Sequence, residues 1–289
     1  MLRKGDLTQG GIITTLLQFT LPMLAGSLLQ QCYNIADTLI VGQCIGANAL
    51  AAVGSAYTLM VFLISILLGL SMGSGTVFSL QYGAGDLSAL RRSIYVSLLL
   101  IGTVTILLNV AVFLWLDPIL RWLQVPYDIY SLMRNYLWII FWGIVFTFLY
   151  NFYAALLRAV GDSVTPLWFL AVSVVLNIGL DLFLILVLDQ GIEGAAVATV
   201  IAQGTAASGI LLYTYKTRPE LRLHREDMCF DRSSLREITS FSTLTCVQQS
   251  VMNFGILMVQ GLVNSFGTVV MAAFAAAVKI DSFAYMPVQ

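Results

Sequence analysis

The sequence predicts an all-α membrane protein that crosses the bilayer several times. Of its 289 residues, 59% are hydrophobic and only 10% are charged, and its mean hydropathy is +0.89. A soluble domain carries about 25% charged residues, so a large soluble core is excluded. The apolar residues also gather in stretches of about 20, the length that a helix needs to cross a bilayer.

Eight such stretches are predicted as membrane spans. They lie near residues 13–37, 53–80, 93–116, 135–157, 164–188, 194–214, 239–264 and 270–289. We expect Pro22 to kink the first span and Asp117-Pro118 to end the third, because proline cannot continue the hydrogen-bond ladder of a helix. Thr165-Pro166 suits the first turn of the fifth span. The segment 231–233 (DRS) can cap a helix that enters the seventh.

The positively charged residues are distributed unevenly between the two sides of the membrane. Eleven Lys and Arg side chains fall on one side and two, Arg121 and Arg134, on the other. By the positive-inside rule the N-terminus is cytoplasmic, and we expect a location in the cell membrane, which in a bacterium is the inner membrane. The four cysteines and the single histidine show no spacing typical of a disulfide framework or a metal cluster.

An internal repeat indicates that the spans form two related halves. Phe19-Thr20-Leu21 is matched by Phe241-Ser242-Thr243, and the stretch 46–52 by 267–273. Both copies would start in the cytoplasm, which is the arrangement of parallel repeats in transporters. We therefore expect a six-helix N-terminal bundle at 1–214, a cytoplasmic connector at 215–238, and the first two helices of a second, pseudo-symmetric bundle at 239–289. A matching second half would need four more helices, so we expect the chain to be a truncated form.

Two carboxylates lie in apolar surroundings, where charged groups are costly. Asp37 ends an uncharged run that begins at Leu7, and Asp181 lies inside the fifth span. A charged residue at the centre of a membrane helix costs about 2.5–3.5 kcal/mol on insertion scales, so it is retained mainly where it lines a cavity, carries ions or has a partner. Asn177 lies four residues before Asp181 and shares its helix face. Hard oxygen ligands of this kind suit H⁺ or Na⁺ better than a soft metal.

Other polar side chains follow the helical period and form stripes inside the spans. Single amides and hydroxyls often bond neighbouring helices together, whereas stripes that line a cavity would contact a substrate. The candidate cavity residues are Gln30, Asn34, Gln203, Gln249, Asn253, Lys279 and Asp281. Gln260 and Asn264 continue the face of Gln249 and Asn253. Ser65, Gly69 and Gly73 form a row of small residues that suits close contact between helices.

Short motifs recur in a fixed order along essentially the whole chain. They are Pro22 and Asp37 followed by Val41-Gly42, then 50–54 (LAAVG), 81–85 (QYGAG), 157–162 (LRAVGD), 177–181 (NIGLD) and 191–199 (GIEGAAVAT). Together they resemble the multidrug and toxic compound extrusion (MATE) transporter family. The resemblance implies two six-helix lobes around a central cavity, which rock between inward- and outward-open states. It also implies export of organic, often cationic compounds, driven by inward H⁺ or Na⁺.

The resemblance assigns roles to particular residues. Asp37 matches the acidic residue of the family's first helix, and Thr199 matches the hydroxyl on the sixth. Asn177 and Asp181 match the pair on the fifth helix. These four imply a proton- or cation-coupling site, with no metal other than Na⁺ and no cofactor. The branch with a glutamate on its seventh helix is not supported, because 249–253 (QSVMN) carries no acid.

Functions other than ion-coupled export are also compatible with parts of the sequence. A lipid-linked oligosaccharide flippase of the same broad superfamily is one alternative, and an inactive fragment is another. An intramembrane aspartyl protease is disfavoured, because the sequences around Asp37 and Asp181 lack the YD and GxGD pattern of those enzymes. We expect no enzyme activity and no nucleic-acid partner. The expected partners are small organic substrates and the lipid bilayer.

Overall fold

The computed structural model describes residues 12–285 except 225 and 229, and the long elements of that part of the chain are α-helices. They are α1 (Ile12–Cys44), α2 (Ala47–Gly83), α3 (Leu87–Trp122), α4 (Tyr127–Trp142), α5 (Ile144–Ala159), α6 (Val164–Leu182), α7 (Gly191–Thr217), α8 (Arg232–Asn264) and α9 (Thr268–Tyr285). A π-helical turn, η1 (Phe183–Val187), extends α6, and a 3-10 turn, η2 (Pro219–Leu221), follows α7. The predicted all-α class is confirmed.

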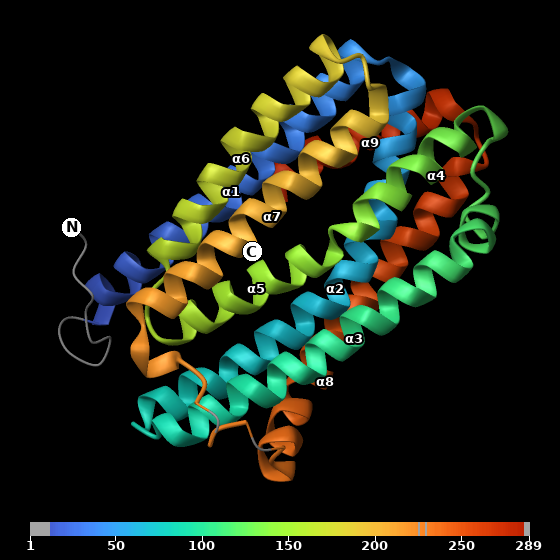
Figure 1. The fold of residues 1–289 in the computed structure, drawn as a ribbon. Helices are drawn as coiled ribbons and strands as arrows, with labels where there is room; N and C mark the ends of the chain where they lie inside the picture. The colour runs from blue at the N-terminus through green and yellow to red at the C-terminus, as the bar shows by residue number, and fades with distance from the viewer. Residues whose placement is uncertain (1–11, 225, 229, 286–289) are drawn as a thin grey trace.

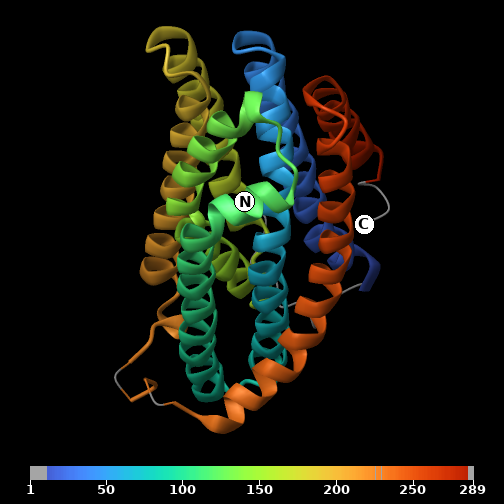
Figure 2. The same ribbon diagram turned by 90° about the vertical axis from the view of Figure 1, so that its right-hand side faces the viewer.

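The long helices lie alongside one another and give the molecule an elongated shape (Figures 1 and 2). The segment between α7 and α8, residues 218–231, lies at one end, which we call the connector end. The turns that follow α1, η1 and α8 lie at the other end, which we call the opposite end. α2 packs against α3, α4 and α5 and also against α8 and α9, so it joins the early helices to the late ones.

Five helices in the described part of the chain are long and apolar enough to cross a membrane. They are α2, α3, α6 with η1, α7 and α8, and α4 with α5 forms a sixth span that is bent by 47°. α1, whose sequence includes Gln30, Asn34 and Asp37, is not among them. The apolar part of α9, Thr268–Val278, is shorter than a span. Length and composition thus bear out five or six of the eight predicted spans.

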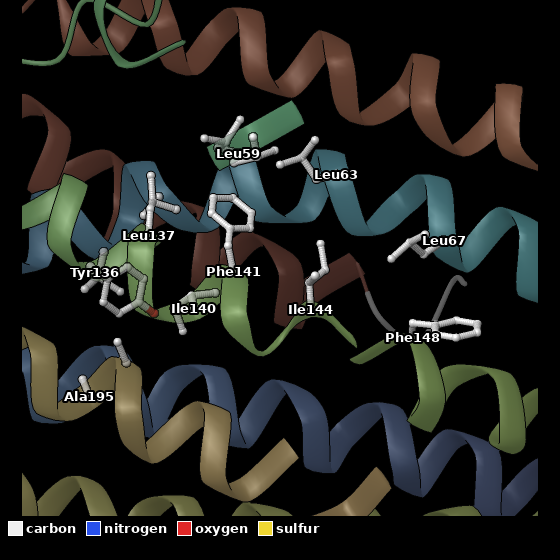
Figure 3. Close-up of a cluster of buried hydrophobic side chains, with 14 of the residues drawn as sticks. Leu59, Leu63, Leu67, Tyr136, Leu137, Ile140, Phe141, Ile144, Phe148 and Ala195 are labelled. Carbon is white, nitrogen blue, oxygen red and sulfur yellow. The ribbon is translucent and has the colours of Figure 1, made fainter. Parts of the chain in front are cut away.

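Apolar side chains of α2, α4 and α5 form the centre of the bundle (Figure 3). Leu59, Leu63 and Leu67 recur every four residues along α2 and therefore lie on one face of it. These leucines pack in one cluster with Phe141 of α4 and Phe148 of α5, and all five side chains are buried. Between membrane helices, contact of this kind stabilises mainly through van der Waals packing, because lipid tails are as apolar as leucine.

The predicted close helix contact at the row of small residues on α2 is confirmed at Gly69 and Gly73, which lie against α8. A Cβ atom at Gly69 would overlap the backbone of Cys246, and one at Gly73 would overlap the backbone of Ser242. The hydroxyl of Ser242 donates to the carbonyl oxygen of Leu70 across the same contact (3.1 Å). The missing side chains on α2 therefore let the two helix backbones approach closely.

α3 does not end at Asp117-Pro118, so that prediction is wrong. The helix continues to Trp122 after a kink at Trp115, whose backbone is not helical (φ −113°, ψ 16°). Proline cannot donate to the carbonyl oxygen four residues before it, so the ladder opens there and the helix bends instead of stopping. α1 likewise runs helically from Ile12 to Cys44 across Pro22. The kink expected at Pro22 stays a prediction.

The fourth predicted span, 135–157, is two helices rather than one continuous helix. α4 and α5 meet at Gly143 with a bend of 47°. A Cβ atom on Gly143 would lie 2.9 Å from Cγ2 of Val200, so glycine allows α7 to approach the bend. The side-chain amide of Asn109 on α3 donates to the carbonyl oxygen of Phe141 (3.0 Å), which satisfies one of the last carbonyl groups of α4.

The connector is held against the early helices by two ion pairs. Arg218 pairs with Asp162, in the turn between α5 and α6, at 3.1 Å, and both side chains are 11% exposed. Asp227 pairs with Arg91, near the start of α3, also at 3.1 Å. Leu221, between these two pairs, is buried. The connector therefore packs on the turns of the first bundle rather than extending away from it.

The predicted cap of α8 is confirmed at Asp231. Its carboxylate accepts hydrogen bonds from the backbone N–H groups of Ser233 (3.0 Å) and Ser234 (3.2 Å) and from the Ser234 hydroxyl (2.7 Å). The bond from the Ser234 hydroxyl and the two backbone bonds lower the pKa of Asp231, because they favour its ionised form. A negative charge at this position also suits the positive end of the helix dipole.

Candidate functional site

Three helices bring the predicted coupling residues together. α6 carries Asn177 and Asp181 on one face, and these side chains are 1% and 0% exposed. Thr199 lies on α7, which packs against α6, and is 4% exposed. Asp37 lies on α1, which packs against both of these helices, and is half-buried. Asp181 lies two residues before the π-helical turn η1, a type of turn that is frequent at functional sites.

The two acids lie close together. The carboxyl groups of Asp181 on α6 and Asp37 on α1 are near enough to interact electrostatically, although they come from different helices. Two carboxylates this close repel each other unless one holds a proton or a cation neutralises them. A single positive charge at the pair would therefore reduce the repulsion between α1 and α6.

Asn177 connects the acid pair to α7. With its amide oriented to satisfy both neighbours, the nitrogen of Asn177 donates to Oδ2 of Asp181 (2.9 Å) and its oxygen accepts from the backbone N–H of Thr199 (3.2 Å). The hydroxyl of Tyr33, one turn before Asp37 on α1, lies 3.4 Å from Oγ1 of Thr199. The structure thus brings Asp37, Asn177, Asp181 and Thr199 into one cluster, which we call the acid cluster.

Two tyrosines beside the acid cluster were missed by the sequence analysis. Tyr33 interacts electrostatically with both Asp37 and Asp181, and so does Tyr136 of α4, which is 5% exposed. Tyr33 lies four residues before Asp37, so the shared helix face could have identified it. Tyr136 comes from a distant part of the sequence, and no local pattern points to it.

The other candidate residues are dispersed and do not join the acid cluster. Gln30 is exposed, and Asn34 donates to the side chain of Gln31 on its own helix (3.3 Å). Gln203 accepts a hydrogen bond from the hydroxyl of Thr147 at a small pocket between α2, α4, α5 and α7. Asn253 donates to the backbone oxygen of Gln249 within α8 (2.8 Å).

The last two cavity candidates lie on α9. Asp281 is exposed. The side chain of Lys279 lies outside the part of the chain that the structure describes.

A multi-pass helical bundle with one buried and one half-buried acid close together between its helices has the architecture of a membrane transporter. The MatE family model matches residues 22–183, which include Asp37, Asn177 and Asp181. The chain belongs to this family of MATE transporters.

Similar proteins extend the match over nearly the whole chain. A protein of Bacillus subtilis (strain 168) described as "Probable multidrug resistance protein YpnP" is 34% identical over 282 residues, which are 98% of this chain and 63% of that protein. The "Multidrug export protein MepA" of Staphylococcus aureus (strain NCTC 8325 / PS 47) is 27% identical over 280 residues, 94% of this chain and 60% of that protein. The chain therefore spans less than two thirds of the length of these relatives.

A solved structure shares the fold. It is described as the MATE multidrug transporter DinF-BH in complex with a ligand, and it aligns with a TM-score of 0.86 at 25% identity. The alignment covers 93% of this chain and 60% of that one. The helices seen here therefore correspond to part of a MATE transporter, in agreement with the predicted fold class.

Proposed function

We propose that this chain forms the ion-coupling part of a secondary antiporter, which exports organic, often cationic compounds in exchange for inward H⁺ or Na⁺. The observation that carries the proposal is the proximity of Asp37 to Asp181, with Asn177 and Thr199 completing the acid cluster. The names of relatives that describe multidrug resistance and export support the class of substrate.

The proposed coupling follows from electrostatics. Two ionised carboxylates this close repel each other by several kcal/mol at the effective dielectric constant of about 20 that applies to protein sites. A proton or Na⁺ removes this repulsion and allows α1 to stay against α6, whereas loss of the ion favours their separation. An ion drives a conformational change only to the extent that it binds one conformer more tightly. The acid cluster supplies such a difference, because its oxygen ligands come from helices that can move apart.

In this proposal the N-terminal and C-terminal parts of the chain have different roles. Residues 1–214 form the first lobe and hold the acid cluster, and 215–238 form the cytoplasmic connector. Residues 239–289 begin the second lobe. Polar side chains between the lobes, among them Gln30, Asn34, Gln249 and Asn253, would contact substrate. The positive charges at the connector end support a cytoplasmic position for it in the cell membrane.

Ion binding is tested with Asp37→Asn in the purified chain. A ligand present at about 100 times its dissociation constant stabilises a protein by about 2.7 kcal/mol, which is measurable as a rise in melting temperature. We expect either Na⁺ or a fall in pH from 8 to 6 to raise the melting temperature of the wild type, and Asp37→Asn to abolish the rise. Asp128→Asn is the matched control, because Asp128 is exposed in the first turn of α4.

Transport is tested separately with ethidium efflux from cells at equal expression. Asp37→Asn should abolish efflux that depends on pH or Na⁺, whereas Asp128→Asn should leave it unchanged. Undiminished efflux in the Asp37→Asn variant would refute the assignment of the acid cluster as the coupling site.

A further inference from the structure

A second group of buried polar side chains lies where α8 meets α2 at the opposite end. Gln260 and Asn264 come from the last turns of α8 and are 3% and 1% exposed. Ser55 and Thr58 lie in the early turns of α2 and are 1% and 7% exposed. None of the four belongs to the acid cluster, and the proposed ion coupling does not use them.

Hydrogen bonds join these side chains into one network. The side-chain nitrogen of Asn264 donates to the carbonyl oxygen of Leu123, just after α3 (2.8 Å), and to the hydroxyl of Ser55 (3.1 Å). The side-chain oxygen of Asn264 accepts from the amide of Gln260 (2.8 Å). The oxygen of Gln260 in turn accepts from the hydroxyl of Thr58 (3.1 Å). The network therefore ties the end of α8 to two helices of the first bundle.

We propose that this network is a latch that holds the opposite end closed between the first lobe and the helix that begins the second. The inference rests on the proposed function, since alternating access needs a gate at each end of the protein. In the proposed division of the chain α8 begins the second lobe. Asn264 and Gln260 are then the second lobe's half of the latch, and Ser55, Thr58 and the Leu123 carbonyl are the first lobe's half.

The chemistry of the network suits a reversible closure. When the opposite end opens to water, each amide and hydroxyl exchanges a protein partner for a water molecule, so the net free-energy change per bond is small. Buried groups that stayed in a dry interface without partners would instead pay the full desolvation penalty. A polar latch is thus stable when closed, and it opens at low cost only where water enters.

The other end of the same helix pair is built differently. There Gly69 and Gly73 bring the backbone of α2 against Cys246 and Ser242 of α8, without room for a Cβ atom. Water cannot replace a contact of this kind without a loss of van der Waals packing. We therefore expect α8 to pivot about the glycine contact when the latch releases, so that the distance between α2 and α8 changes at the opposite end and little at the connector end.

Two pairs of spin labels can separate these movements in the whole chain reconstituted in lipid nanodiscs. Asn48→Cys with Ser265→Cys reports on the opposite end, and Ala84→Cys with Ser240→Cys reports on the connector end; all four positions are exposed. The native cysteines are first replaced by serine or alanine, at Cys32, Cys44, Cys229 and Cys246. Pulsed electron paramagnetic resonance then gives the distance distribution of each pair.

Two nearly isosteric variants break the latch in different ways. Thr58→Val removes the donor to Gln260, and Asn264→Asp replaces the donor that faces Leu123 with an acceptor. Thr245→Val is the matched control, because within the described residues the hydroxyl of Thr245 donates only to the backbone oxygen of Phe241 in α8. Since one hydrogen bond has a net worth of about 0.5–1.5 kcal/mol, Thr58→Val should raise the ratio of long to short distances roughly two- to twelvefold at the opposite end.

The proposal expects the same direction of change for Asn264→Asp, no change for Thr245→Val, and an unchanged connector-end pair in every variant. Unchanged opposite-end distances in both latch variants would overturn it, and so would equal broadening at both ends, which indicates general loss of packing. The distance measurement requires neither ion nor substrate. A failure of Asp37→Asn to affect ion binding would therefore refute the coupling site without changing the outcome for the latch.

Discussion

Gly73→Ala tests whether the backbones of α2 and α8 are in contact. The added Cβ atom would overlap the backbone nitrogen and Cα of Ser242, which cannot be relieved by rotating a side chain. Overpacking of this kind typically costs about 1–3 kcal/mol. Alanine is favoured over glycine in a helix by roughly 0.5–1 kcal/mol, which offsets part of the cost. We therefore expect Gly73→Ala to destabilise the protein by up to about 2.5 kcal/mol.

The same substitution at Gly179 provides the control, because a Cβ atom there would have no neighbour within 4 Å. Gly179→Ala should stabilise the protein by up to about 1 kcal/mol through helix propensity alone. Both variants can be compared with the wild type by reversible unfolding in mixed micelles of dodecyl maltoside and SDS. If Gly73→Ala is at least as stable as the wild type, the close contact between α2 and α8 is wrong.

Two further predictions concern the acid cluster and the connector. Asn177→Leu removes the bonds to Asp181 and to the Thr199 backbone, so the affinity for Na⁺ or the proton should change about 10–100-fold, as for groups that orient ion ligands; an unchanged ion titration of melting temperature would contradict this. Burial opposes ionisation of Asp227, but the backbone N–H of His224 (3.1 Å) and the Arg91 guanidinium outweigh it and lower the pKa of Asp227. A carboxyl group whose pKa is lowered by folding stabilises the folded state at pH values above its pKa in the unfolded chain. This stabilisation disappears as the pH falls through the pKa of the folded state, below about 4. Hydrogen exchange at the His224 amide, corrected for its intrinsic rate, should therefore accelerate in that range in the wild type, whereas Asp227→Asn should exchange faster at every pH and lose this dependence; equal protection in both would refute the reasoning.

The sequence predicts the helices better than their irregularities. Hydropathy and length locate the spans, because crossing a bilayer demands about 20 apolar residues regardless of what surrounds them. The end predicted at Pro118 is wrong because the rule for proline is local, whereas Leu116 and Leu120 are buried on both sides of it and keep the helix packed beyond the kink. The bend at Gly143 depends on Val200, which lies on another helix and gives no signal in the neighbouring sequence.

The candidate site was predictable only in part, for a similar reason. The shared face of Asn177 and Asp181 follows from helical spacing. The approach of Asp37 to Asp181 does not, because it depends on how α1 packs against α6, and it was expected from the family resemblance. No pattern in the sequence around Tyr136 indicates that it lies beside the acid cluster. The polar face of Gln260 and Asn264 was recognised on α8, but its partners on α2, Ser55 and Thr58, are ordinary small residues in an apolar helix and were not.

The packing of α1 explains why an ion at the acid cluster would act on this helix. Among the α1 residues whose side chains the structure describes, Val41 alone is buried, whereas Asn177 and Asp181 on α6 are almost fully enclosed. The element with fewer buried contacts costs less free energy to displace. Repulsion between Asp37 and Asp181 would therefore move α1 rather than α6. Because α1 also contacts α2, one of the two helices that the proposed latch joins, its displacement can be transmitted to the latch.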